Sequence, residues 1–148
     1  DTMGVRSMKL DEGDYVVDMA IARNGVEVLT VSENGYGKRS DLVEYRLQSR
    51  AGKGIKAGTF NEKTGQLVNL KLINPDNDIM LIADNGIVIR VRAKEISKIG
   101  RDTQGVRIMK FKGDAKVVCV SESPASEDVD GGEGATDGGD GGEAPAEE

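Results

Sequence analysis

Basic side chains fall into two clusters of six that occupy matching places in the sequence. One cluster follows Asn34-Gly35 and the other follows Asn85-Gly86. The clusters are Lys38, Arg39, Arg46, Arg50, Lys53 and Lys56, and Arg90, Arg92, Lys94, Lys98, Arg101 and Arg107. Lysine and arginine side chains repeated along one edge suit a phosphate backbone, because counterion release then supplies affinity without reading sequence. A solvated charged edge would show the same pattern, so the residues alone leave both interpretations open.

Glycines interrupt the first cluster in Arg50-Ala51-Gly52-Lys53-Gly54, where they would let backbone N–H groups approach phosphates closely. No catalytic constellation accompanies the basic residues. The chain has no histidine, no Walker A sequence and no cluster of metal ligands. We therefore expect no catalytic residue, no metal, no cofactor and no small-molecule substrate for this chain.

An internal repeat indicates the elements that must carry these side chains. Thr2–Leu10 returns as Thr103–Phe111 with six of nine residues identical, and Asn34-Gly35 returns 51 positions later as Asn85-Gly86. A period of about 50 residues lies near that of propeller-type blades. Each unit would be a small sheet that cannot bury its own faces.

Alternating and continuous apolar runs between turn sequences predict an all-β chain. Tight turns are expected at 23–25, 33–35, 74–77 and 84–86, and one short turn is expected within 93–99. The expected strands are 15–22, 27–32, 36–45, 67–73, 79–83, 87–94, 106–112 and 116–121. The predicted plan is two four-stranded antiparallel units and a half unit, of which these eight strands are the ones located. The half unit would need strands from elsewhere to cover its edge.

The charge is divided sharply between two segments. Residues 122–148 carry ten acidic and no basic side chains, with seven glycines, which predicts a disordered acidic tail. Residues 1–121 carry 16 acidic and 20 basic side chains, so a body of charge +4 bears a tail of charge −10. Because the chain opens inside a repeat without a methionine, we expect a piece of a longer protein that ends at its natural C-terminus.

A single cysteine, Cys119, excludes an internal disulfide, and its valine neighbours place it in the expected core. No stretch approaches the roughly 20 apolar residues of a membrane span.

Three stretches of the chain resemble the C-terminal domain of the A subunit of bacterial DNA gyrase. They are Asn34-Gly35-Tyr36-Gly37-Lys38-Arg39, Glu44-Tyr45-Arg46-Leu47-Gln48-Ser49-Arg50-Ala51-Gly52-Lys53-Gly54-Ile55, and Glu95-Ile96-Ser97 with Gly100-Arg101-Asp102-Thr103-Gln104-Gly105-Val106. The resemblance covers residues 1 to about 121 and implies a β-pinwheel of six four-stranded blades that exchange strands. Double-stranded DNA would wrap around its basic rim, which orients the DNA for ATP-dependent negative supercoiling.

The resemblance also implies partners and a location. The catalytic tyrosine and the ATP- and Mg²⁺-dependent steps would belong to the rest of the A subunit, together with the B subunit, in an A2B2 enzyme in the bacterial cytoplasm, at the nucleoid. The acidic tail would modulate DNA binding. Two alternatives stay open: the related subunit of topoisomerase IV, and a propeller-like module that binds proteins.

The family's hallmark box reads Gln-Arg-Arg-Gly-Gly-x-Gly, and the aligned run here is Gln48-Ser49-Arg50-Ala51-Gly52-Lys53-Gly54. Ser49 and Ala51 depart from it, so this run resembles a degenerate copy from a later blade. The expected DNA-contacting residues are Lys38, Arg39, Arg46, Gln48, Arg50, Gly52, Lys53, Gly54, Lys56, Arg90, Arg92, Lys94, Arg101 and Arg107.

Overall fold

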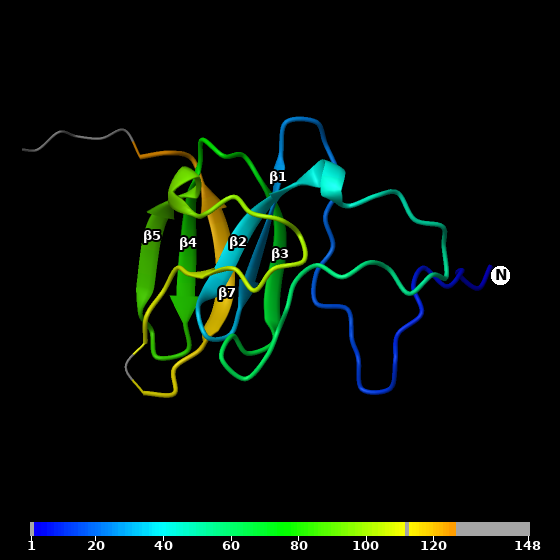
Figure 1. Cartoon of the computed structure of the whole chain (residues 1–148), viewed down its shortest axis with the longest axis horizontal. Coiled ribbons are helices and arrows are strands. Elements are labelled where there is room, and N and C mark those ends of the chain that lie inside the picture. Colours follow the sequence, from blue (N-terminus) through cyan, green and yellow to red (C-terminus); the bar gives the residue numbers. More distant parts are fainter. Residues whose placement is uncertain (1, 112, 127–148) are drawn as a thin grey trace, which may run out of the picture.

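The computed structural model describes residues 2–111 and 113–126, and there every regular element is a β-strand except two short 3₁₀ turns. The elements are β1 (Glu27–Ser32), β2 (Tyr36–Asp41), η1 (Leu42–Glu44), β3 (Leu67–Ile73), β4 (Asp78–Ala83), β5 (Val88–Arg92), η2 (Ala93–Glu95), β6 (Val106–Arg107) and β7 (Val117–Ser123). They build two antiparallel sheets, ordered β3-β1-β2-β6 and β5-β4-β7 (Figure 1). The predicted all-β, propeller-like fold class is confirmed. The described part holds no helix that could cross a membrane.

Each sheet is organised around one hairpin whose turn the sequence predicts. Residues 33–35 join β1 to β2, and residues 84–86 join β4 to β5. Gly35 and Gly86 have φ values of 75° and 82°, a conformation that glycine adopts without steric cost. In both turns the glycine N–H donates across the turn at 3.0 Å, to Ser32 O and to Ala83 O respectively. The two hairpins are structural copies, which confirms the repeat.

The remaining strands are shared between successive units. β3 pairs with β1 and β7 pairs with β4, each in antiparallel register. β6 lies beyond the second hairpin and returns to pair with β2, placing Val106 opposite Gly37 and Arg107 opposite Tyr36. Each sheet therefore collects strands from more than one repeat. The first sheet has the expected four strands, and the second has three among the described residues.

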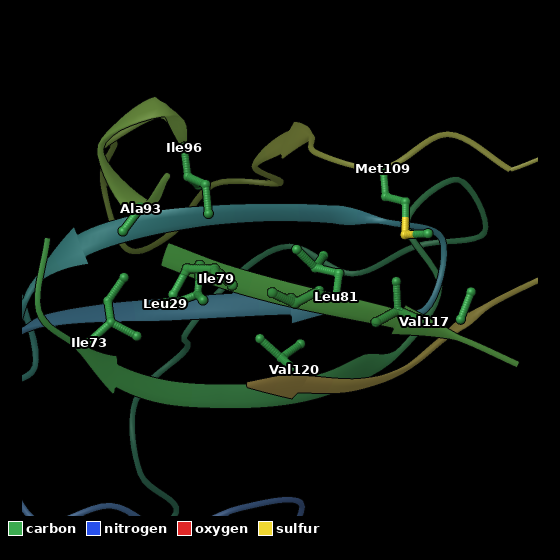
Figure 2. Close-up of a cluster of buried hydrophobic side chains, with 11 residues drawn as sticks. Leu29, Ile73, Ile79, Leu81, Ala93, Ile96, Met109, Val117 and Val120 are labelled. Carbon is green, nitrogen blue, oxygen red and sulfur yellow. The ribbon is translucent and has the colours of Figure 1, made fainter. Parts of the chain in front are cut away.

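The apolar core draws on both sheets (Figure 2). Leu29 on β1, Ile79 and Leu81 on β4, and Val120 on β7 are buried in one cluster. Met109, which follows β6, is buried with them, so the shared strand also contributes to the core. Burial of each large side chain contributes roughly 1.5–3 kcal/mol. The core therefore fixes the two hairpins relative to one another.

The strand expected at 15–22 is wrong. Residues 15–23 form no regular element, and Tyr15 and Met19 are 74% and 84% exposed. The apolar alternation is present, but a strand needs a neighbouring edge with which to pair. Both edges of β1 are already occupied by β2 and β3, and among the described residues no backbone hydrogen bond pairs 15–22 with the outer edge of β3. The segment instead lies against β3 through a hydrogen bond from Asn69 Nδ2 to Asp18 Oδ2 of 2.9 Å.

Three other expected strands are shorter than predicted. β5 covers only Val88–Arg92 of the expected 87–94. β2 ends at Asp41, where η1 begins, and β6 contains only two residues. β6 stops because the N–H groups of Ile108 and Met109 both donate to the carbonyl of Gly35, which turns the chain away from β2. The short turn expected within 93–99 is confirmed as η2.

The expectation that Cys119 lies in the core is also wrong, because the side chain is exposed. An irregularity in the pairing of β7 with β4 shifts the alternation, so that Val117 and Val120 point inward instead. β7 continues to Ser123, two residues into the segment that the sequence assigned to the tail. Residues 127–148, the larger part of the expected tail, lie outside the described residues.

Candidate nucleic-acid interface

Lys38 is a buried structural side chain. It lies on β2 with 2% of its surface exposed. Its ammonium donates to the carbonyl oxygens of Gly100 at 3.1 Å, of Thr103 at 2.8 Å, and of Arg101. Burial lowers the pKa of Lys38 below its ordinary value, because the interior disfavours the charged form. The donors of Lys38 therefore fix residues 100–103 beside β2. This burial disfavours a contact with phosphates, and the expected contact stays a prediction.

Arg39 is likewise occupied inside the protein, with 8% of its surface exposed. Its Nη1 lies 2.5 Å from Glu27 Oε2 on β1. Its Nε donates to the carbonyl of Ile96 at 2.7 Å and its Nη2 to the carbonyl of Lys94 at 3.0 Å. Arg39 thus attaches the chain after β5 to the first hairpin. Its burial and these three partners disfavour a phosphate contact at Arg39, and this second expected contact on β2 also stays a prediction.

The same arrangement recurs 51 positions later, around Arg90. Arg90 Nε lies 2.8 Å from Asp78 Oδ2, and Arg90 Nη2 donates to the carbonyl of Pro124 at 3.0 Å. The backbone N–H of Ser126 also donates to Asp78 Oδ2, at 3.1 Å. Hydrogen bonds from Ser126 and then Arg90 lower the pKa of Asp78. Arg90 is more exposed than Arg39, yet its guanidinium mainly holds residues 124–126 against the second hairpin.

Several expected contact residues are exposed but engaged with carboxylates. Lys56 Nζ lies 3.0 Å from Asp102 Oδ1, and Lys94 Nζ lies 2.5 Å from Asp76 Oδ1. Arg101 donates through Nη1 to the carbonyl of Lys56, which ties two loops together. Such exposed pairs contribute about 0–1 kcal/mol each, so a phosphate could displace the carboxylates at small cost.

Arg107 lies over an aromatic ring. Its guanidinium carbon is 5.0 Å from the centroid of Tyr36, and its Nη2 donates to the Tyr36 hydroxyl at 2.9 Å. Lys63 places its ammonium 5.6 Å from the centroid of the same ring. Sequence reasoning missed Lys63, because it lies in a turn outside both basic clusters. The two cations give the Asn34-Gly35 end of the first hairpin a positive surface.

The clearest group of available cations lies in the segment 45–58, the basic loop, which follows η1. Arg46, Gln48, Arg50 and Lys53 are exposed. Within residues 2–111 and 113–126, no ion pair engages the side chains of Arg46, Arg50 or Lys53. The loop therefore holds the expected contact residues that remain free to bind an anion.

The backbone of the basic loop bends sharply at its centre. Ala51 has φ of 60° and is the one non-glycine residue of the described ranges with positive φ; Gly54 has φ of 81°. The loop is attached to the N-terminal segment, since Lys9 N donates to Gly52 O and Ala51 N donates to Ser7 O, both at 2.9 Å. Lys9 is therefore brought beside the basic loop. Sequence reasoning missed it, although the repeat places it in the same position as Lys110.

The two basic clusters do not form one continuous row. The basic loop extends on the side of β3 and the N-terminal segment, whereas β5, with Arg90 and Arg92, forms the opposite side (Figure 1). Arg92 is exposed, and Lys94 lies in η2 directly after β5. The structure therefore gathers the expected residues into separate patches rather than into a single edge.

The two hairpins are copies of one another and share strands with later segments. Each carries an arginine–carboxylate pair at the same place. These features define a β protein built from repeated blades. The sequence model of the family described as DNA gyrase C-terminal domain, beta-propeller, matches residues 1–23, 27–74 and 77–120. The chain belongs to this family, so the resemblance found in the sequence is confirmed.

The relatives agree with this assignment. The DNA gyrase A subunit of Staphylococcus epidermidis is 43% identical over 127 residues, covering 84% of this chain and 14% of that protein. A solved structure of a DNA gyrase A C-terminal domain superposes with a TM-score of 0.75 at 30% identity, covering 80% of this chain and 41% of that one. A C-terminal domain of DNA topoisomerase IV superposes with a TM-score of 0.74, covering 82% of this chain and 38% of that one, and at 20% identity it shows the fold alone. The chain thus spans about a seventh of the curated relatives it matches.

Proposed function

We propose that this chain binds duplex DNA through its phosphates, without reading base sequence. The observation that carries the proposal is the group of exposed cations in the basic loop, Arg46, Arg50 and Lys53, which no carboxylate of the described residues engages. Lysine and arginine contacts to phosphates position a protein on DNA but carry no sequence information. Membership of the gyrase C-terminal family supports this choice of ligand.

The bend of the basic loop supports the same proposal. Ala51 has a positive φ and aligns with a glycine of the family's box. The backbone of this copy therefore keeps a conformation that glycine adopts more easily than alanine does. Arg50 and Lys53 are exposed on either side of Ala51 and Gly52 in the sequence, and Gly52 and Gly54 carry no side chain that would hold a phosphate away from the backbone. Arg92, Lys94, Arg101 and Arg107 would extend the contact along other parts of the surface.

At the level of the whole protein, we propose that the chain is part of the C-terminal domain of a gyrase A subunit, where it positions DNA for the ATP-dependent reaction of its partners. It would contribute no catalytic step itself. The B subunit, ATP and Mg²⁺ would act elsewhere in the assembled enzyme. This proposal rests on the similarity of the chain to DNA gyrase A subunits. The chain corresponds to only a part of their length.

The test is binding to a duplex of about 40 base pairs across a salt series. The logarithm of the association constant should fall linearly with the logarithm of the salt concentration, by about 0.9 for each phosphate neutralised, so the three loop cations alone predict a slope of about −2.7. Duplexes of unrelated sequence should bind equally well. Affinity that hardly changes with salt would contradict the proposal, and a protein partner retained after nuclease treatment would favour a protein-binding module instead.

Removal of residues 127–148 is expected to tighten DNA binding. The removed segment carries nine acidic side chains and no basic ones, and the residues directly before it, 124–126, lie beside Arg90 and Asp78 of the second hairpin. The carboxylates would compete with phosphates for the same cations. The deletion should begin after Ser126, because Glu122 accepts hydrogen bonds from Asn74 and Asn77 and belongs to the fold. Unchanged affinity at low salt would rule out this competition.

A further inference from the structure

Both ends of the basic loop are attached to one short segment, residues 100–103. The backbone N–H of Arg101 donates to Glu44 Oε2 at 2.6 Å, directly before the loop. The guanidinium of Arg101 donates through Nη1 to the carbonyl of Lys56, near the end of the loop. If extended, the chain from residue 44 to residue 56 could span roughly 40 Å. The loop instead runs out from the sheets and returns (Figure 1), with its two ends held at a single residue.

The two ends of the loop are attached unequally. On the exit side, Lys56 Nζ lies 3.0 Å from Asp102 Oδ1, and Thr59 N donates to Thr103 O at 3.1 Å. On the entry side, the hydrogen bond that reaches residues 100–103 is the one accepted by Glu44. The same carboxylate oxygen lies over Gly100, 3.9 Å from the position of a Cβ there. Attachment of the loop entry therefore depends on the Glu44 carboxylate.

The segment to which the loop is attached is itself fixed to the first sheet. The buried ammonium of Lys38 on β2 receives the carbonyls of Gly100, Arg101 and Thr103. Glu44 is the last residue of η1, which begins directly after β2. The closure of the loop thus has a rigid base, and a change at Glu44 would release the loop entry without removing that base.

The charge of Glu44 is opposite to the one that a phosphate-binding loop needs. The side chain is exposed and stands two residues before Arg46, so by charge alone it would repel phosphates and lower the affinity for DNA. Glu95 occupies the same place at the end of η2, 51 positions later, and is also exposed. No ion pair engages Glu95 within the part of the chain that the structure describes, and it does not border the basic loop. A geometric role for Glu44 therefore makes a prediction of the opposite sign to that of its charge.

We infer that Glu44 is a positioning residue for DNA binding. It closes the basic loop on Arg101 and so holds the three loop cations, Arg46, Arg50 and Lys53, in the arrangement that meets phosphates. The inference rests on the proposed function of this loop. A loop with both ends fixed has fewer conformations to lose when it binds a ligand, because part of the ordering is already present in the free protein. Glu44 thereby raises the affinity for an anion although it is negative itself.

Glu44→Ala and Glu44→Gln are the decisive pair of variants. Both remove the same negative charge, but the amide oxygen of glutamine can still accept the N–H of Arg101. Glu44→Ala should weaken binding to a duplex of about 40 base pairs by about threefold to tenfold, as expected for the loss of a hydrogen bond to a charged group. Glu44→Gln should keep the affinity of the wild type. Glu95→Ala is the matched control, since it removes a glutamate from the copied position, and it should not weaken binding.

Limited digestion of the full chain with trypsin measures the order of the loop without DNA. The loop contains three exposed trypsin sites, Arg46, Arg50 and Lys53. Glu44→Ala should speed cleavage after these residues by about threefold to tenfold, measured by mass spectrometry relative to cleavage after the exposed Arg23 of the same chain. Glu44→Gln and Glu95→Ala should leave the ratio unchanged.

Two results would overturn the inference. One is cleavage of the loop in Glu44→Ala at the wild-type ratio. The other is duplex binding by Glu44→Ala that is as tight as binding by Glu44→Gln. A wild-type chain that binds no duplex would instead refute the proposed function, and the cleavage ratios would then still decide whether Glu44 closes the loop.

Discussion

Replacement of Arg50 and Lys53 by alanine should reduce the salt dependence of duplex binding by about 1.8 in the log–log slope, since each phosphate contact contributes about 0.9. At about 0.1 M salt the association constant should fall by roughly one order of magnitude or more. Both side chains are exposed on the basic loop and engage no carboxylate among the described residues, so their loss should leave folding stability nearly unchanged. Fluorescence anisotropy with a labelled duplex measures both quantities.

The matched control removes two other positive charges. Arg23 and Lys110 are exposed and lie outside the basic loop and β5. Their double replacement by alanine changes the net charge by the same amount, and it should alter the slope by much less. Equal slopes for the two double variants would mean that the chain is attracted to DNA by its overall charge, and the basic loop would then have no special role.

The hairpins of this fold could be predicted because the residues that specify each of them are neighbours in the sequence. An Asn-Gly turn between apolar runs specifies two antiparallel strands without reference to the rest of the chain. The pairing of β6 with β2 could not be predicted in this way, because the two strands lie about 70 residues apart and β6 has only two residues. The same limit explains segment 15–22, whose alternation is that of a strand although its backbone does not pair with the outer edge of β3 beside it.

The basic loop could be predicted from charge spacing, whereas the burial of Lys38 and Arg39 could not. Their strand, β2, has no apolar alternation. It is buried by residues 94–103, which lie far from it in the sequence. One signal was available. Arg39 with Glu27 recurs as Arg90 with Asp78 at the repeat period, and a charge pair that repeats with the fold indicates a structural pair. A cation that contacts a ligand has no such requirement for a carboxylate partner.

Replacement of Lys38 by methionine should be the most damaging single change in the first hairpin. It preserves the aliphatic length but leaves the carbonyls of Gly100, Arg101 and Thr103 without their buried donor. Unsatisfied buried acceptors of this kind cost about 1–3 kcal/mol each, so a loss of about 3 kcal/mol in the free energy of unfolding is expected. Urea unfolding measures it. Lys56→Met is the control: that lysine is exposed and pairs with Asp102 at the surface, so its loss should change stability by about 0.5 kcal/mol or less.

The pH dependence distinguishes this structural role from a DNA contact. Because burial lowers the pKa of Lys38, the unfolded chain binds more protons than the folded chain as the pH approaches the ordinary lysine value of 10.5. The contribution of Lys38 to stability should therefore rise with pH through that alkaline window, whereas Tyr45 and Lys98, whose pKa values are raised, contribute in the opposite direction. The Lys38 contribution is the difference between the pH profiles of Lys56→Met, which retains it, and Lys38→Met, which lacks it. The salt slope of DNA binding by folded Lys38→Met should equal that of the wild type. A Lys38→Met chain of normal stability with a slope lower by about 0.9 would place the ammonium on a phosphate instead.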